Sequence, residues 1–339
     1  MTNVKPAKQK SQKIRVDFKR TSFWVRFKLK YCNTAFWWRV VFVIFRLVLL
    51  LGISYVILFP FFAKIAGSFM SPEDFADVTV SLIPKYPTLD AYKRIIVDNH
   101  YFKAAGNTLV LSVLCGVLQT FACSVIGYGF AKFKFRGAKL AFVLVLFTMI
   151  VPHQTMRVSL SVFFGHFDFW GLLKSLGLPT ITLTDSYWPL VILSITGLGF
   201  KNGLYIFMMR QFYRGVPDEL EESAYIDGYG VFKTFLYIII PLSVPMMITI
   251  FLFSFSWQWT DGFYTDIFFV DPIEKRYLMP DVIDISNIQF ANINSAILDT
   301  YKNAVANTAG LMVLIPLIII YLFCQRYLIQ GIERSGLVG

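Results

Sequence analysis

The residues best suited to do chemistry lie in an acidic block, residues 217–230, between two long apolar runs. Glu221 and Glu222 have the functional groups that acid–base catalysis needs. Neighbouring residues of a helix point about 100° apart, however, and no nucleophile accompanies this pair. We therefore expect no catalytic residue in the chain and do not interpret it as an enzyme.

Metal and nucleotide sites have recognisable spacings, and none occurs here. His100, His153 and His166 are far apart in the sequence and stand in no metal-binding motif. The cysteines at positions 32, 115, 123 and 324 show no metal spacing, and the middle two lie about 12 Å apart along one helix, too far for a disulfide. The phosphate-binding pattern G-x-x-x-x-G-K-[ST] is missing, so the chain itself is expected to bind neither a metal ion nor ATP.

The acidic block has the features of a short helix. Pro217 suits the first helical position, and four of the six residues 217–222 are acidic, which places negative charge at the positive end of the helix dipole. Gly228 is expected to end the helix in a left-handed conformation, with Gly230 at the corner before a second helix from Val231. One narrow stripe of the first helix would consist of Leu220, Ser223, Ala224 and Asp227.

The spacing within this block resembles the EAA loop (EAA-x3-G-x9-I-x-L-P) of permease subunits in ATP-binding-cassette (ABC) importers. Residues 222–241 read ESA-x3-G-x9-I-x-I-P, which differs by two mild substitutions. The longer string from residue 210 to 228 is similar to that of the carbohydrate-importer branch. The end of the chain, from Gln325-Arg326-Tyr327 onward, is similar to the tail of maltose-type second permeases.

This resemblance implies the inner-membrane permease subunit of a carbohydrate importer with the type I permease fold. It implies that residues 217–230 form a cytoplasmic coupling loop against a dimer of ABC ATPases, which bind ATP and Mg²⁺ in place of this chain. A second homologous permease and an extracytoplasmic solute-binding protein are the other implied partners. The implied ATPase-coupling residues are Glu219, Leu220, Glu222, Ser223, Ala224, Asp227 and Gly228.

Composition independently indicates a membrane protein. Of 339 residues, 56% are hydrophobic, and the mean hydropathy of +0.59 exceeds that of ordinary soluble domains. The net charge of +11 arises largely in residues 1–39, a basic and aromatic leader next to an apolar run. Such a leader suits the cytoplasmic side of a bilayer and its lipid headgroups better than nucleic acid.

We predict an all-α, multi-pass protein of the bacterial cytoplasmic membrane with both termini inside. Residues 1–39 form the leader and residues 40–339 the permease domain. Charge asymmetry and apolar length predict six transmembrane spans. The predicted spans are residues 40–62, 107–131, 140–152, 187–209, 241–259 and 304–323.

The fourth predicted span contains Lys201 and Asn202. Because a cation in hydrocarbon costs several kcal/mol, Lys201 is expected to face a polar cavity or a partner subunit, or to reach toward the interface. A sugar cavity needs aromatic rings and a few polar groups. The predicted substrate-pathway residues are Asn202, Trp257, Gln258 and Trp259, and the two tryptophans fit an interfacial belt equally well.

Two other functions fit parts of these observations. A permease for an amino acid or polyamine would share the coupling loop, but it would usually lack the lead-in from residue 210 and the Gln325-Arg326-Tyr327 tail. An ion-driven secondary transporter would need carboxylates inside the membrane, and the six predicted spans contain almost none.

Overall fold

The computed structural model describes residues 22, 24, 34–169, 171–199, 201–270, 277–291 and 293–336, without the side chains of residues 35 and 332–336. Most of the predicted leader, residues 1–39, therefore lies outside the described residues. Contacts divide the chain into residues 1–62 and residues 63–339. The only regular secondary structure among the described residues besides helix is one antiparallel bridge between Phe167 and Ile181, which confirms the all-α prediction.

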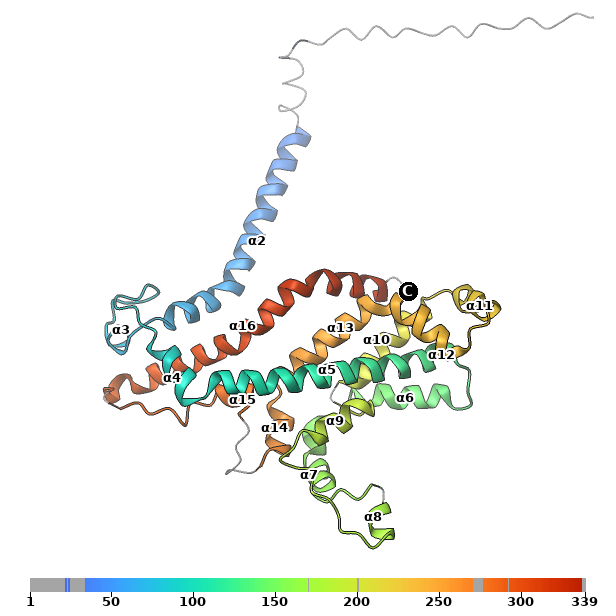
Figure 1. Ribbon diagram of the computed structural model, residues 1–339. Helices are drawn as coiled ribbons and strands as arrows, with labels where there is room; N and C mark the ends of the chain where they lie inside the picture. The colour runs from blue at the N-terminus through green and yellow to red at the C-terminus, as the bar shows by residue number, and fades with distance from the viewer. Residues whose placement is uncertain are drawn as a thin grey trace, which may run out of the picture. The chain divides into compact units, whose positions relative to one another are not determined.

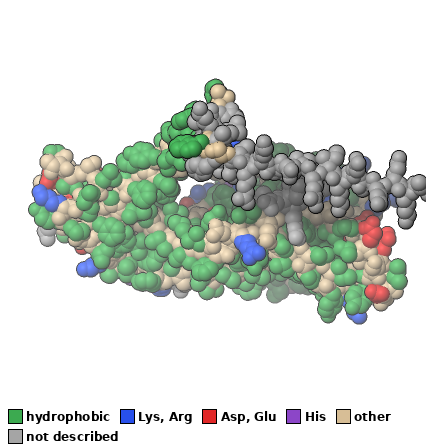
Figure 2. Space-filling model, turned by 90° about the horizontal axis from the view of Figure 1, so that it is seen from above, with side chains coloured by type: hydrophobic (Ala, Val, Ile, Leu, Met, Phe, Trp, Pro, Cys, Tyr) green, Lys and Arg blue, Asp and Glu red, His purple; other side chains and the backbone are tan. Residues whose placement is uncertain are grey.

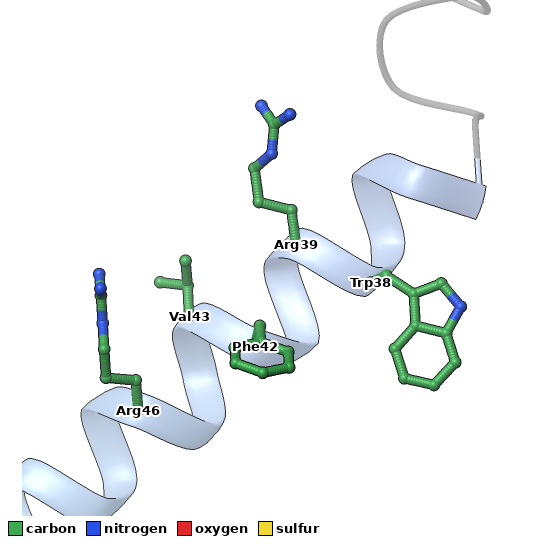
Figure 3. Close-up of a pocket in the computed structure, with 5 residues that line it drawn as sticks. All are labelled: Trp38, Arg39, Phe42, Val43 and Arg46. Atoms are coloured by element: carbon green, nitrogen blue, oxygen red, sulfur yellow. The ribbon is translucent and has the colours of Figure 1, made fainter.

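Helix α2 (Thr34–Gly67) contains the first predicted span. At 1.5 Å per residue its 34 residues extend about 50 Å, more than the ~30 Å of a hydrocarbon core. A shallow groove of about 540 Å³ on its surface is lined by Trp38, Arg39, Phe42, Val43 and Arg46. Figure 3 shows that Arg39, Val43 and Arg46 point to the same side. Because one helix supplies every lining residue, this groove is part of the helix surface and not an enclosed site.

Residues 63–339 form a bundle centred on α5 (Tyr101–Lys132). Helix α5 packs along α10 (Asn202–Arg214) and along α13 (Ile240–Trp259), and α13 packs along α16 (Ser295–Gly336) (Figure 1). The α5–α10 contact depends on a glycine, since a Cβ on Gly127 would lie 2.6 Å from the Cβ of Met209. The long helices therefore meet at nearly backbone distance.

The shorter helices lie around this bundle. Helix α11 (Asp218–Ile226) lies at one end, and α3 (Pro72–Ala76) and α4 (Asp90–Asp98) lie at the opposite end (Figure 1). Figure 2 shows apolar side chains over the middle of the visible face and acidic side chains at the end that carries α11. The remaining short helices are α6 (Ala138–Thr148), α7 (Arg157–Gly165), α8 (Leu172–Ser175), α9 (Trp188–Ile195), α14 (Gly262–Phe268) and α15 (Met279–Val282).

Among the described residues, four helical runs are long and apolar enough to cross a membrane: α2, α5, Val231–Trp259 and α16. A fifth candidate is Ala138–Thr148 together with His153–Gly165, two helical pieces that meet at 98°. The structure thus supports several of the predicted spans and leaves the count of six as a prediction.

Three predicted spans differ from the helices of the structure. The third was predicted to run to residue 152, but α6 ends at Thr148 and the chain turns near Pro152, whose missing N–H cannot continue a helix. The fourth, residues 187–209, is broken between α9 and α10, where Gly197 and Lys201 have positive φ. The fifth begins at residue 231 and not at 241, because α12 (Val231–Thr234) and a π-helical turn, η2 (Phe235–Ile239), lead directly into α13.

Candidate functional site

Helix α11 forms where the acidic block predicts a helix, and it begins one residue later than predicted. Pro217 is the N-cap, and the helix itself begins at Asp218. At the other end Gly228 has φ +82°, which confirms its predicted left-handed conformation. The N–H of Tyr229 donates to the Ala224 carbonyl at 2.9 Å and the N–H of Gly228 to the Tyr225 carbonyl at 3.1 Å. This pair of bonds is the Schellman ending of a helix, which only glycine adopts without strain.

The predicted coupling residues divide into an exposed set and one buried member. Ala224 is 3% exposed and faces the bundle, so it does not belong to an outward stripe. The hydroxyl of Ser223 donates to the Glu219 carbonyl at 2.7 Å within the helix. The exposed members are Glu219, Leu220, Glu222, Ser223, Asp227 and Gly228. Helix α11 therefore exposes acidic side chains together with the apolar side chains of Leu220, Tyr225 and Ile226.

Lys132, at the end of α5, ties α11 to the bundle, and the sequence analysis did not identify this contact. Its ammonium donates to the Val216 carbonyl at 2.8 Å and to Asp218 Oδ1 at 2.6 Å, and it lies 3.3 Å from Glu221 Oε1. The Lys132 side chain is 8% exposed and that of Glu221 is 10% exposed. The hydrogen bond from Lys132 lowers the pKa of Asp218.

Glu221 has a different role from its exposed neighbour Glu222. One oxygen accepts a hydrogen bond from the Tyr128 hydroxyl at 3.3 Å, and the other forms an ionic contact with Lys132 that lacks hydrogen-bond geometry. Both partners belong to α5. The adjacent acids thus point in different directions, as helix geometry requires: Glu221 holds α11 to α5, and Glu222 remains on the outer face.

A cavity of about 780 Å³ lies where the third and fourth predicted spans are interrupted. The loop after α6, helix α7 and the ends of α9 and α10 form most of its wall, and the wall is rich in phenylalanine. Asn202 and Lys201 line it, as does Tyr264 of α14. Lys201 therefore lines a cavity, as one of the three expected alternatives required, but the wall of this cavity is mostly apolar and not polar as predicted.

The other predicted substrate-pathway residues lie elsewhere. Trp257 is 48% exposed, and the Lys201 ammonium sits 4.8 Å from the centroid of its ring. Gln258 is buried, and its Nε2 has no partner among the described residues. Trp259 lies in the hydrophobic core and donates its indole N–H to the Val313 carbonyl at 3.0 Å. Its indole N–H is therefore already used in the core, and its role in the substrate pathway stays a prediction.

Comparisons with known proteins place this geometry in a family. Residues 124–334, more than half of the chain, match the family described as "Binding-protein-dependent transport system inner membrane component". The chain is 29% identical to the arabinooligosaccharides transport system permease protein AraQ of Bacillus subtilis, over 85% of this chain and 92% of AraQ. It is 25% identical to the galactooligosaccharides transport system permease protein GanQ of the same organism, over 89% of this chain and 97% of GanQ.

A solved structure shows the same fold. A chain of a bacterial ABC transporter involved in the import of the acidic polysaccharide alginate superposes with a TM-score of 0.62 at 23% identity, over 85% of this chain and 96% of that one. The chain belongs to the family of binding-protein-dependent transport system inner membrane components.

Proposed function

We propose that this protein is a permease subunit of an ATP-driven importer and moves a sugar or oligosaccharide into the cytoplasm by alternating access. The observation that carries the proposal is α11, a short acidic helix fixed by Lys132 at one end of an apolar bundle with Glu222 on its outer face. The family assignment supports import dependent on a binding protein. The names of AraQ and GanQ support an oligosaccharide substrate.

The proposed partners follow from the same helix and family. A dimer of ABC ATPases, which binds ATP and Mg²⁺, would contact the outer face of α11. A second, homologous permease would complete the pathway, and a solute-binding protein would deliver the sugar at the opposite end of the bundle. No step of this scheme requires catalysis by the present chain.

The contacts around α11 explain how a push on it would reach the bundle. On its N-terminal side Lys132 joins it to α5, and beyond Gly228 the chain enters the helical run Val231–Trp259. Both of these helices pack along each other through the centre of the bundle. A displacement of α11 would therefore move the two central helices together, as alternation between inward-open and outward-open states requires.

We propose that α11 and both termini lie on the cytoplasmic side of a bacterial cytoplasmic membrane, with six spans of which the fourth is broken. Charge distribution supports this orientation. Lys132 ends α5 at the end of the bundle that carries α11, Lys134 and Arg136 follow it, and cations of this kind collect on the cytoplasmic side.

A charge reversal on the outer face tests the function. Glu222→Lys should abolish ATP-driven uptake of labelled oligosaccharide and release the ATPase from the purified complex, because a cation would then face the basic groups expected in the ATPase groove. The variant should still insert and pair with the second permease. Glu73→Lys is the matched control for release of the ATPase, since Glu73 is also exposed but lies on α3 at the opposite end. Normal uptake by Glu222→Lys would refute the role of α11 in coupling.

A further inference from the structure

The cavity lies at two helix interruptions. In transporters, such interruptions place the partial charges of helix ends near the middle of the membrane. Helix α6 ends at Thr148 and α10 begins at Asn202, and both of these residues line the cavity. The first N–H groups of a helix have no partner within that helix. Gly203 and Leu204, which both line the cavity, carry such N–H groups. The 13-residue α10 therefore directs the positive end of its dipole at the cavity wall.

The side chains of the cavity wall add positive charge to that of the helix N-terminus. Lys201 is the one lysine or arginine among the described lining residues, and these include no aspartate or glutamate. The residue precedes α10 and has φ +63°, a conformation that is uncommon for residues other than glycine. The ring of Trp257 lies against its ammonium, and an aromatic face orients a cation while leaving its charge in place.

The wall also contains an unsatisfied amide. Asn202 is 1% exposed, and neither its Nδ2 nor its Oδ1 has a hydrogen-bond partner among the described residues. Leaving a buried amide unpaired costs about 1–3 kcal/mol, so such a group indicates a partner that binds there. Asn202 stands next to Lys201 and at the first position of α10, which places the cation, the amide and the helix N-terminus together.

We propose that this cavity binds an acidic oligosaccharide and holds one of its carboxylates between the Lys201 ammonium and the N-terminus of α10, with the Asn202 amide as a hydrogen-bond partner. The inference rests on the proposed importer function and adds the substrate class. The volume of about 780 Å³ lies within the range of ligand pockets, and phenylalanine side chains on its wall can cover sugar faces. One lysine supplies a single positive charge, which matches a carboxylate better than a phosphate monoester of charge about −2.

The test compares two trisaccharides of matched size on the full-length chain in its importer complex, reconstituted in lipid nanodiscs. Trigalacturonate carries carboxylates, and galactotriose is its neutral counterpart. Binding is measured by calorimetry with the original complex and with Lys201→Asn, since asparagine tolerates positive φ and removes the charge. Lys174→Gln is the control, because Lys174 is exposed on α8 and does not line the cavity.

We expect trigalacturonate to bind more tightly than galactotriose. Lys201→Asn should weaken trigalacturonate about 10- to 100-fold and galactotriose less than about 2-fold, as expected for loss of a charged hydrogen bond. Lys174→Gln should change neither value. Equal loss for both sugars would show a structural role for Lys201 and overturn the proposal. Preference for galactotriose, or tight binding of galactose-1-phosphate in place of trigalacturonate, would overturn it as well.

These outcomes are separable from failure of the proposed function. If ATP-driven uptake of neutral oligosaccharides persists and depends on Glu222, the chain is a sugar importer subunit and only the acidic-substrate inference fails. If no oligosaccharide of either kind is taken up by cells that produce the complete importer, the proposed function fails.

Discussion

Removal of the Lys132 charge tests how α11 is held to the bundle. In Lys132→Met the side chain keeps an apolar stem of similar length and loses its ammonium. Three contacts then disappear together: those to the Val216 carbonyl, to Asp218 and to Glu221. Glu221 keeps the hydrogen bond from the Tyr128 hydroxyl, at 3.3 Å, and loses its cation. We therefore expect α11 to leave its docked position while the long helices remain folded.

The free-energy cost of undocking α11 is estimated from the burial of the Lys132–Glu221 ion pair. Both side chains, at 8% and 10% exposure, are nearly inaccessible, and removal of one partner of a buried pair costs about 3–5 kcal/mol. Asp218 is largely exposed and adds little to this cost. Once α11 undocks, water reaches the Glu221 carboxylate and limits the free-energy cost. We therefore take the lower value of the range, about 3 kcal/mol. A loss of about 3 kcal/mol changes the ratio of docked to undocked α11 by roughly 100-fold.

Hydrogen exchange measures this ratio, because a helix as short as α11 is not stable in water once it leaves the bundle. The amides of residues 222–226 should lose protection by roughly 100-fold in Lys132→Met, and ATP-driven uptake should fall with it. Lys139→Met is the matched control, since Lys139 is an exposed residue of the neighbouring helix α6.

The double variant Lys132→Met, Glu221→Gln distinguishes the loss of the ion pair from a general loss of structure around α11. It removes the stranded charge, so protection should recover in part, with a coupling energy of at least about 1 kcal/mol. Unchanged protection in the single variant would refute the anchoring role of Lys132. Losses that simply add in the double variant would show that the two side chains do not act as a pair.

Two further changes test the end of α11 and a buried acid that follows α13. Gly228→Val should destabilise the docked helix by more than about 1 kcal/mol and lower the yield of complex with the ATPase. Gly230→Val is the control, because Gly230 has φ −80° and should tolerate the substitution. Equal yields for the two variants would contradict the left-handed ending of α11. Asp261 caps α14 through the N–H groups of Phe263 and Tyr264, and burial raises its pKa to about 6. The pKa of Asp261 in the folded protein exceeds the unfolded value of about 3.9. The contribution of Asp261 to stability is therefore greatest below about pH 4 and falls as the pH rises through 6, by up to about 3 kcal/mol. Asp261→Asn should therefore raise the unfolding temperature at about pH 8 and not at about pH 4, and an equal change at both values would contradict a charge effect.

The parts of the site that local sequence determines were predictable. The start of α11 within one residue of Pro217 and its end at Gly228 follow from a proline, a run of acids and a glycine that act on their own neighbours. The Lys132 anchor was not predictable in this way. Lys132 and Glu221 are far apart in the sequence, and the cations after α5 indicated only membrane orientation. Only the packing of α5 against α10 brings the two charges together.

The cavity shows why apolar length alone does not define spans. A window of about 20 residues averages over Gly197 and Gly199, so it predicts a continuous helix for the fourth span. The third span was predicted to end at Pro152, and its helix ends four residues earlier, at Thr148. The helices break near Pro152 and at Gly197, although Pro245 and Pro316 stand inside continuous helices. The backbone groups released at a break need polar partners or a polar space. Both interruptions lie on the wall of one cavity, next to Lys201, the cation in the fourth predicted span. In this chain, helix breaks and a lysine within apolar runs coincide with a cavity, whereas Trp259, an aromatic residue also predicted for the substrate pathway, is buried in the core.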